Sequence, residues 1–174
     1  KPDITTLLKV MHLGFPIGMT TLAEVGSFSA ATILMGWVGK IELAAHGIMM
    51  QIFSLAFMVP LGVSQAATIR IGTALGEKNK KKIYEASKSV YIIGLGCGII
   101  IMLSLFLGGE SFIKLFLDQN VINSDEVLKF ASIFLVYGIF FHIFDCGQIL
   151  SIGLLRGLSD TRIPFYFCLL SYWG

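Results

Sequence analysis

Long apolar stretches alternate with short polar segments along the whole chain. The apolar stretches cover residues 9–39, 43–76, 84–107 and 127–155, and a fifth runs from residue 163 to 174. A helix rises about 1.5 Å per residue and needs roughly 20 mostly apolar residues to cross the hydrocarbon core of a bilayer. The pattern therefore predicts an all-α membrane protein, with four transmembrane helices and the start of a fifth.

Composition favours a membrane protein over the alternative, a soluble all-α core. The chain is 55% hydrophobic and only 14% charged, and its mean hydropathy is +0.81. A soluble domain averages about 45–50% apolar and about 25% charged residues. The net charge of +2 is too small to indicate nucleic acid as a partner, so membrane lipid is the expected surrounding. The three cysteines all lie in apolar stretches, and their odd number predicts no disulfide framework.

Basic residues predict the orientation of the helices. If the segments alternate across the membrane, the lysine-rich loop at 77–83 and the loop holding Arg156 and Arg162 lie on the same side as the N-terminal end. The opposite side receives Lys40 and the acid-rich loop at 108–126. Because short cytoplasmic loops are enriched in Lys and Arg, we expect the N-terminal end and both basic loops to be cytoplasmic. The lysine cluster is then explained by topology and by contact with lipid headgroups.

Two acidic residues interrupt the apolar stretches near their middle. Glu24 lies about 22 Å along the helix from Lys9 and about 24 Å from Lys40, and Asp145 lies about 16 Å from Arg156. A charged side chain at the bilayer centre costs about 2.5–3.5 kcal/mol on insertion scales, so such residues usually serve a function. Burial favours the neutral form of a carboxyl group, so each acid suits a proton carrier or a ligand for a hard cation such as Na⁺. The alternative for each is a structural acid bonded to a neighbouring helix.

Polar and aromatic residues lie at helical spacing around the two acids. Thr20, Glu24 and Ser27 share one helical face, and Phe141, Asp145 and Gln148 share another. His142 precedes Asp145 by three positions, within hydrogen-bonding reach on a helix. We expect the remaining polar and aromatic members of a cavity to be Gln51, Ser54, Phe28, Phe53, Phe57 and Phe144. His46 is read instead as an interhelical hydrogen bonder.

These motifs, taken together and in order, resemble the C-terminal six-helix half of the multidrug and toxic compound extrusion (MATE) family of secondary exporters. The resemblance spans nearly the whole chain. It rests on Pro16, Gly18, Glu24, Gly36, Gly39, His46, Gln51, Pro60, Gly62, Arg70, Gly72, Gly76, Asp145, Gln148, Gly153, Arg156, Gly157, Asp160 and Pro164.

The resemblance implies an exporter of twelve helices in two lobes, in which this chain is part of one lobe and a missing N-terminal lobe is its partner. Such exporters are not enzymes, need no cofactor, and expel bulky, often cationic drugs in exchange for H⁺ or Na⁺. Glu24 and Asp145 fall on the family's coupling positions, where Na⁺ is one candidate ligand. Some sodium-coupled relatives carry Tyr one turn before the second acid, where this chain has Phe141, and this difference favours H⁺. The implied location is a bacterial plasma membrane.

Three other functions remain as alternatives. A lipid-linked precursor flippase shares the two-lobe plan, but anionic headgroups call for buried Arg or Lys, whereas the charged residues expected at the midplane here are acids. An intramembrane aspartyl protease needs two close Asp residues in Gly-Asp-type motifs, which the two acids do not match. A passive channel would be separated from an antiporter by an ion-exchange assay. Because the last apolar stretch stops early, we also expect a fragment of a longer protein, unstable without its other half.

Overall fold

The computed structural model of the protein describes residues 3–117 and 123–174. In chain order these residues form α1 (Ile4–Val38), α2 (Lys40–Gly76), α3 (Lys80–Phe116), α4 (Ser124–Gly157) and α5 (Arg162–Trp173), and they contain no strand. The first four helices are long and apolar enough to cross a membrane. The predicted all-α membrane fold is thereby confirmed.

The third helix is longer than the apolar pattern predicts. We expect it to end at residue 107, yet α3 continues to Phe116. Ile113 in this extension is fully buried, and Lys114 forms an ion pair with Glu110 at 2.6 Å, one turn away. Gly109 does not end the helix: its φ is not positive, and it lies directly against the side chain of Leu135 on α4. The middle of the predicted acid-rich loop, residues 118–122, lies outside the described residues.

The other connections at the helix ends are short. Gly39 alone separates α1 from α2, and residues 77–79 separate α2 from α3. The side chain of Asn79 accepts a hydrogen bond from the backbone N–H of Lys82 at 3.1 Å and so caps α3. Asp3 caps α1 in the same way, and hydrogen bonds from Thr5 and Thr6 hold the pKa of its carboxyl below the usual value.

Helices α2, α3 and α4 pack closely through small residues. Gly94 and Gly98 of α3 lie against Leu150 and Cys146 of α4, and Gly153 of α4 lies against Ser64 of α2. The hydroxyl of Ser64 donates a 2.7 Å hydrogen bond to the carbonyl of Ile149 across this contact. Small residues let helix backbones approach in lipid, where the hydrophobic effect does not drive helices together. Close van der Waals packing at the glycines and interhelical hydrogen bonds therefore hold these three helices together.

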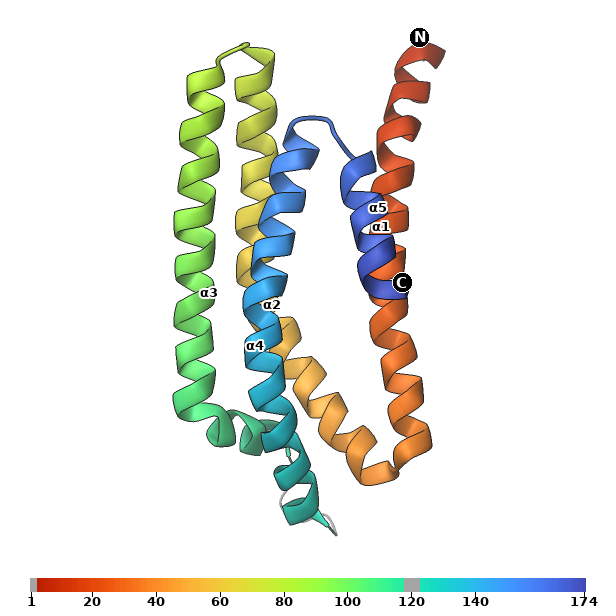
Figure 1. Ribbon diagram of the computed structural model, residues 1–174, viewed down its shortest axis with the longest axis vertical. Helices are drawn as coiled ribbons and strands as arrows, with labels where there is room; N and C mark the ends of the chain where they lie inside the picture. Colours follow the sequence, from red (N-terminus) through yellow and green to blue (C-terminus); the bar gives the residue numbers. More distant parts are fainter. Residues whose placement is uncertain (1–2, 118–122) are drawn as a thin grey trace.

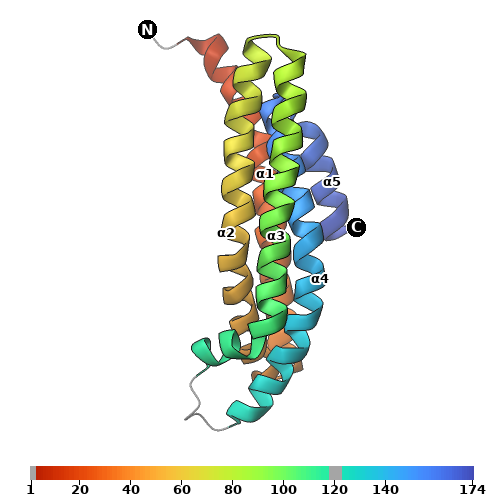
Figure 2. The ribbon, with the colours of Figure 1, turned by 90° about the vertical axis from the view of Figure 1, so that its left-hand side faces the viewer.

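Helices α1 and α5 form a separate pair beside these three (Figures 1 and 2). The indole N–H of Trp173 on α5 donates a 3.0 Å hydrogen bond to the carbonyl of Ala23 on α1. α2 bends along its length and contains Pro60, which removes one backbone hydrogen bond (Figure 1). The backbones of α1 and α4 stay apart, and the space between them becomes the site described below.

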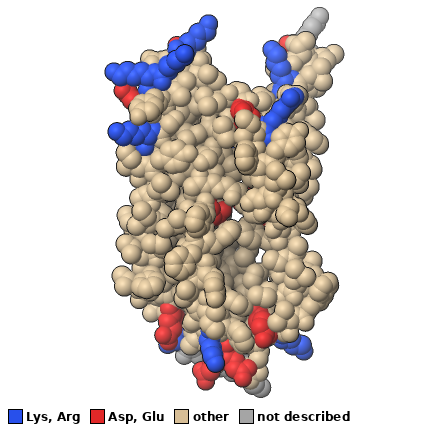
Figure 3. All heavy atoms as spheres, viewed as in Figure 1, with Lys and Arg blue, Asp and Glu red and all other residues tan. Residues whose placement is uncertain are grey.

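Charged residues gather at the two ends of the bundle. Figure 3 shows Lys and Arg mainly at the end that carries the start of α1, and most Asp and Glu at the opposite end. Figure 1 shows that the α2–α3 and α4–α5 connections lie at that same basic end. The structure thus places the three predicted basic segments together. The cytoplasmic location of these basic segments stays a prediction.

Candidate functional site

A cavity of about 780 Å³ lies between α1, α2 and α4. Both Glu24 of α1 and Asp145 of α4 line it. The other lining residues are mostly apolar or aromatic. They are Val25, Phe28, Ser29, Ala31, Thr32, Met35, His46, Gly47, Met49, Met50, Phe53, Ser54, Phe57, Phe134, Tyr137, Gly138, Phe141 and His142. In Figure 3 acidic atoms are visible in the middle of a hollowed face whose central part is otherwise free of charged residues.

Helical spacing explains how each element contributes to the wall. On α1 the lining residues Glu24, Phe28 and Met35 follow one another at intervals of four and seven positions, which keeps them on one face. His46, Phe53 and Phe57 do the same on α2. The cavity is therefore the meeting place of three helical faces.

The two acids are half-buried and have no direct partner. Within residues 3–117 and 123–174, neither carboxyl group forms a hydrogen bond or an ion pair with another side chain. The ion pairs that these ranges do contain join lysines to glutamates near the helix ends. The two carboxyl groups act on one another electrostatically, and the half-buried guanidinium of Arg156 acts on Glu24. An unpaired carboxyl pair in an apolar cavity has the chemistry to bind a cation or to carry protons.

Aromatic rings border the acids. Phe28 and Phe141 meet edge-to-face across the space between α1 and α4, with ring centroids 6.3 Å apart. Phe53 packs beside His142 at 6.1 Å and covers Gly138, where no side chain would fit. Aromatic faces attract cations by about 0.5–2 kcal/mol each, depending on solvation. The wall thus suits a flat or cationic organic guest.

The two histidines that line the cavity differ from the sequence-based expectation in their hydrogen bonding. The ring Nε2 of His142 lies 3.5 Å from the Sγ of Cys146, and within the described ranges no hydrogen bond joins His142 to Asp145. His142 lines the cavity as expected, and its side chain is buried, at 2% exposure. His46 lines the cavity, and its Nδ1 is buried without a hydrogen-bond partner among the described residues. His46 therefore joins the wall and does not link helices.

Four residues predicted to support the cavity are absent from the lining among the described residues. The hydroxyl of Thr20 is buried and donates to the carbonyl of Pro16 at 2.7 Å. The amide of Gln148 donates to the hydroxyl of Tyr172 on α5 at 3.0 Å. Gln51 is exposed and Ser27 is half-buried outside the lining, since both lie on other faces of their helices.

The expected aromatic wall is present in part. Phe28, Phe53 and Phe57 line the cavity as expected, and so does Ser54, whereas Phe144 is 76% exposed and lies outside the lining. Sequence reasoning missed Met35, Met49 and Met50. The signal that would have found the last two is their spacing, one turn before Phe53 on α2, since Phe53 was expected in the wall.

Comparisons with known proteins agree with this architecture. The sequence profile of the MatE family matches residues 16–174. The chain is 46% identical over 176 residues to a "Probable multidrug resistance protein NorM" of Agrobacterium fabrum, and the match covers 99% of this chain. Proteins with the same name from Rhizobium meliloti and Pseudomonas putida are 41% and 37% identical, each again over 99% of this chain. The chain spans 37% of the length of each of these relatives.

The family profile covers most of the chain, including α2, α3, α4, α5 and the part of α1 that contains Glu24, and the relatives match the chain almost from end to end. The cavity is bordered by residues of the same region. The protein therefore belongs to the MatE family of multidrug and toxic compound extrusion proteins.

Proposed function

We propose that this chain is part of the C-terminal lobe of a secondary active multidrug exporter, which expels organic cations in exchange for H⁺ or Na⁺. One observation carries the proposal: two unpaired acids from different helices line one cavity whose wall is otherwise apolar and aromatic. The names of the relatives support drug resistance as the outcome of transport.

The proposed mechanism is exchange of positive charge at a shared site. With both carboxyl groups ionised, the cavity holds an organic cation through the charges of Glu24 and Asp145 and the faces of Phe28 and Phe141. When H⁺ or Na⁺ enters and neutralises the acids, the drug loses its counter-charge and leaves. Each cation lowers the affinity for the other by the same factor, because binding linkage is reciprocal. Phe141 offers no oxygen to Na⁺, which favours H⁺ as the coupling ion.

Transport of an anionic lipid-linked precursor is the second candidate. It requires a cation where the headgroup binds, yet Lys and Arg are absent from the cavity lining among the described residues. Arg156 acts on Glu24 from outside that lining. The charge of the cavity therefore favours a positive substrate.

The location and the partners follow from the same proposal. The cavity region is hollowed on the face seen in Figure 3, and we propose that a second lobe of the whole protein faces it. We also propose that the protein resides in a bacterial plasma membrane with the basic end in the cytoplasm, where positive loops are enriched.

Efflux of ethidium, a fluorescent aromatic cation, from cells that express the full-length protein tests this function. We expect Glu24→Gln and Asp145→Asn each to reduce efflux about tenfold or more, since each removes a charged partner of the cation. Glu110→Gln is the matched control, because it also neutralises one acid but lies at the end of α3, paired with Lys114. Unchanged efflux in both cavity variants would exclude the proposed mechanism.

A further inference from the structure

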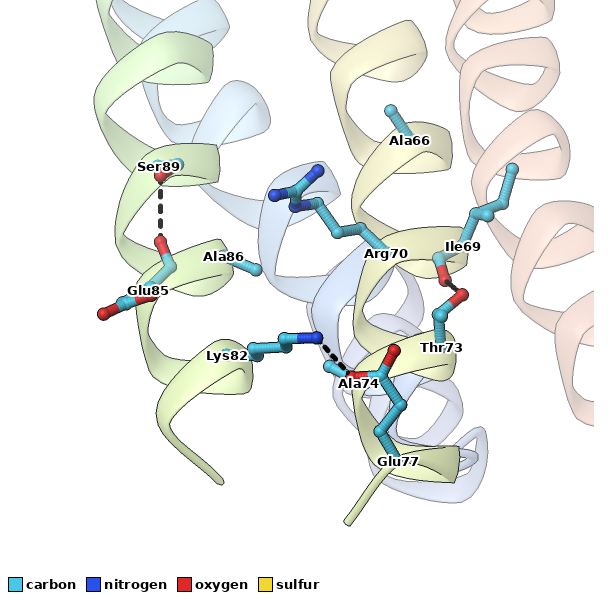
Figure 4. A pocket seen from close by; sticks show the side chains of 10 residues that line it. All are labelled: Ala66, Ile69, Arg70, Thr73, Ala74, Glu77, Lys82, Glu85, Ala86 and Ser89. Atoms are coloured by element: carbon cyan, nitrogen blue, oxygen red, sulfur yellow. Dashed lines mark hydrogen bonds and ion pairs between the residues drawn. The ribbon is translucent and has the colours of Figure 1, made fainter. Parts of the chain in front are cut away.

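A second hollow, separate from the cavity, lies between α2 and α3 at the basic end of the bundle. Its volume is about 840 Å³. We call it the Arg70 groove, and Figure 4 shows the residues that line it. They are Ala66, Ile69, Arg70, Thr73, Ala74, Glu77, Lys82, Glu85, Ala86 and Ser89.

Arg70 is the unmatched charge of this groove. Figure 4 shows its guanidinium group extending from α2 into the space between the two helices. Lys82 is paired with Glu77 at 2.6 Å, and Glu85 lies 3.9 Å from Lys81. Within the described parts of the chain Arg70 has no hydrogen bond or ion pair. Its planar fork of N–H donors is thus free to bind a phosphate or carboxylate.

The depth of Arg70 matches the phosphate layer of a bilayer. It lies six residues before the end of α2, which is about 9 Å inward from the α2–α3 connection. α2 has 37 residues and is about 55 Å long, which is about 10–15 Å more than a bilayer with its headgroups, so a centred helix extends about 5–8 Å beyond the bilayer at each end. Arg70 then lies about 1–4 Å inside the headgroup layer, which is about 5–8 Å thick. A lipid phosphate at this level therefore reaches Arg70, whereas the lysines at the α2–α3 connection lie further out, toward the water. The surrounding segment, residues 70–88, carries six basic and two acidic residues, which favours a headgroup with net negative charge.

The faces that form the groove continue toward the membrane centre as an apolar track. On α2 the positions four and eight residues before Arg70 are Ala66 and Gly62, and on α3 the positions four and seven residues after Ser89 are Ile93 and Gly96. A Cβ added at Gly62 or Gly96 would meet no atom within 4 Å, and Ile93 is 55% exposed. An acyl chain can lie along this track below a phosphate held by Arg70, whereas a soluble anion would gain nothing from it.

We propose that the Arg70 groove binds the phosphate of an anionic phospholipid, with the acyl chain lying along the small apolar residues of α2 and α3. This site is independent of the drug cavity and does not rest on the proposed export function. It assigns a specific ligand to Arg70 beyond the general attraction of the lysine cluster for the membrane surface.

Native mass spectrometry of the purified full-length protein tests the site, with added phosphatidylglycerol and phosphatidylcholine as the two lipids. We expect the wild type to prefer phosphatidylglycerol, and Arg70→Gln to weaken that lipid's affinity about fivefold or more. Lys88→Gln is the matched control, because it also removes one positive charge, but from an exposed position of α3 outside the groove lining. The affinity of this variant for phosphatidylglycerol should stay within about twofold of the wild type. Arg70→Lys should fall between the wild type and Arg70→Gln, since an ammonium binds phosphate as a point charge.

Each alternative result overturns the proposal. Equal losses in Arg70→Gln and Lys88→Gln would indicate surface attraction alone. Displacement of phosphatidylglycerol by millimolar inorganic phosphate would indicate a site for soluble anions. A wild type with no preference between the lipids would show that lipid does not occupy the groove. If Arg70→Gln does not fold, unchanged phosphatidylglycerol affinity in Arg70→Lys would count against the site in the same way.

Discussion

Gly153 of α4 provides a sharp test of the helix packing that frames the cavity. A Cβ added at this position would overlap the hydroxyl of Ser64 and would lie 2.5 Å from the backbone oxygen of Ser64. Ordinary carbon contacts begin near 3.5 Å, so α2 and α4 would have to separate by about 1 Å. The backbone oxygen cannot rotate away as a flexible side chain does. Two hydrogen bonds would lengthen with the separation: Ser64 to Ile149 and Thr68 to Gly153.

The expected cost of Gly153→Ala follows from these contacts. Overpacking a tight interface costs about 1–3 kcal/mol. Weakening two interhelical hydrogen bonds adds about 0.6 kcal/mol each in a membrane protein. The higher helix propensity of Ala compared with Gly offsets about 1 kcal/mol of this destabilisation. The net destabilisation should therefore be about 1–3 kcal/mol.

Thermal unfolding of the full-length protein in detergent, followed by fluorescence, measures this effect. Gly147→Ala on the same helix is the control, because a Cβ there meets no atom within 4 Å. We expect Gly153→Ala to unfold at a lower temperature than the wild type and Gly147→Ala to match or exceed the wild type. Adding Ser64→Ala should not rescue Gly153→Ala, since the backbone oxygen remains in place. Equal stability of the two alanine variants would refute the packing described here.

Two further predictions concern the cavity wall and the α1–α5 pair. Gly138→Ala should displace the ring of Phe53, which covers Gly138, and should therefore lower ethidium efflux. The unfolding temperature should change little, because a side chain moves aside more easily than a backbone. A marked fall in stability with normal efflux would contradict this prediction. Trp173→Phe removes the hydrogen bond to the carbonyl of Ala23 and should destabilise the full-length protein by about 0.6–1.7 kcal/mol, measured by the same unfolding assay. An unchanged unfolding temperature in Trp173→Phe would mean that this bond does not hold α5 on α1.

The helical architecture was predictable because lipid demands long apolar stretches, and these are visible in the sequence. Glu24 and Asp145 are visible for the same reason, since a carboxyl group within such a stretch stands out. Their similar depth predicts a shared site, and the structure places both on one cavity. Their coupling role remains a prediction.

The face that each helix presents to the cavity was harder to predict. α1 lines the cavity with Ser29 and Thr32 as well as Phe28 and Met35, whereas Thr20 and Ser27 lie outside the lining. On its other contact α1 accepts the hydrogen bond of Trp173 from α5 at the carbonyl of Ala23. Gln148 likewise faces Tyr172 of α5. Periodicity identifies a face only when one side is polar and the other apolar, and a helix in lipid lacks that contrast. The end of α3 was missed because Gly109 serves as a close contact with Leu135 and not as a terminator.

The central claim is that Glu24 and Asp145 hold one cation together. A double-mutant cycle of ethidium binding on the purified full-length protein tests it most directly, with Glu24→Gln, Asp145→Asn and the double variant. Residues that share a ligand show interaction energies of about 0.5–3 kcal/mol, whereas independent sites add within about 0.3–0.5 kcal/mol. We predict that each single variant weakens binding and that the double variant departs from additivity by at least about 1 kcal/mol. Additive losses, or unchanged affinity in either single variant, would contradict the account.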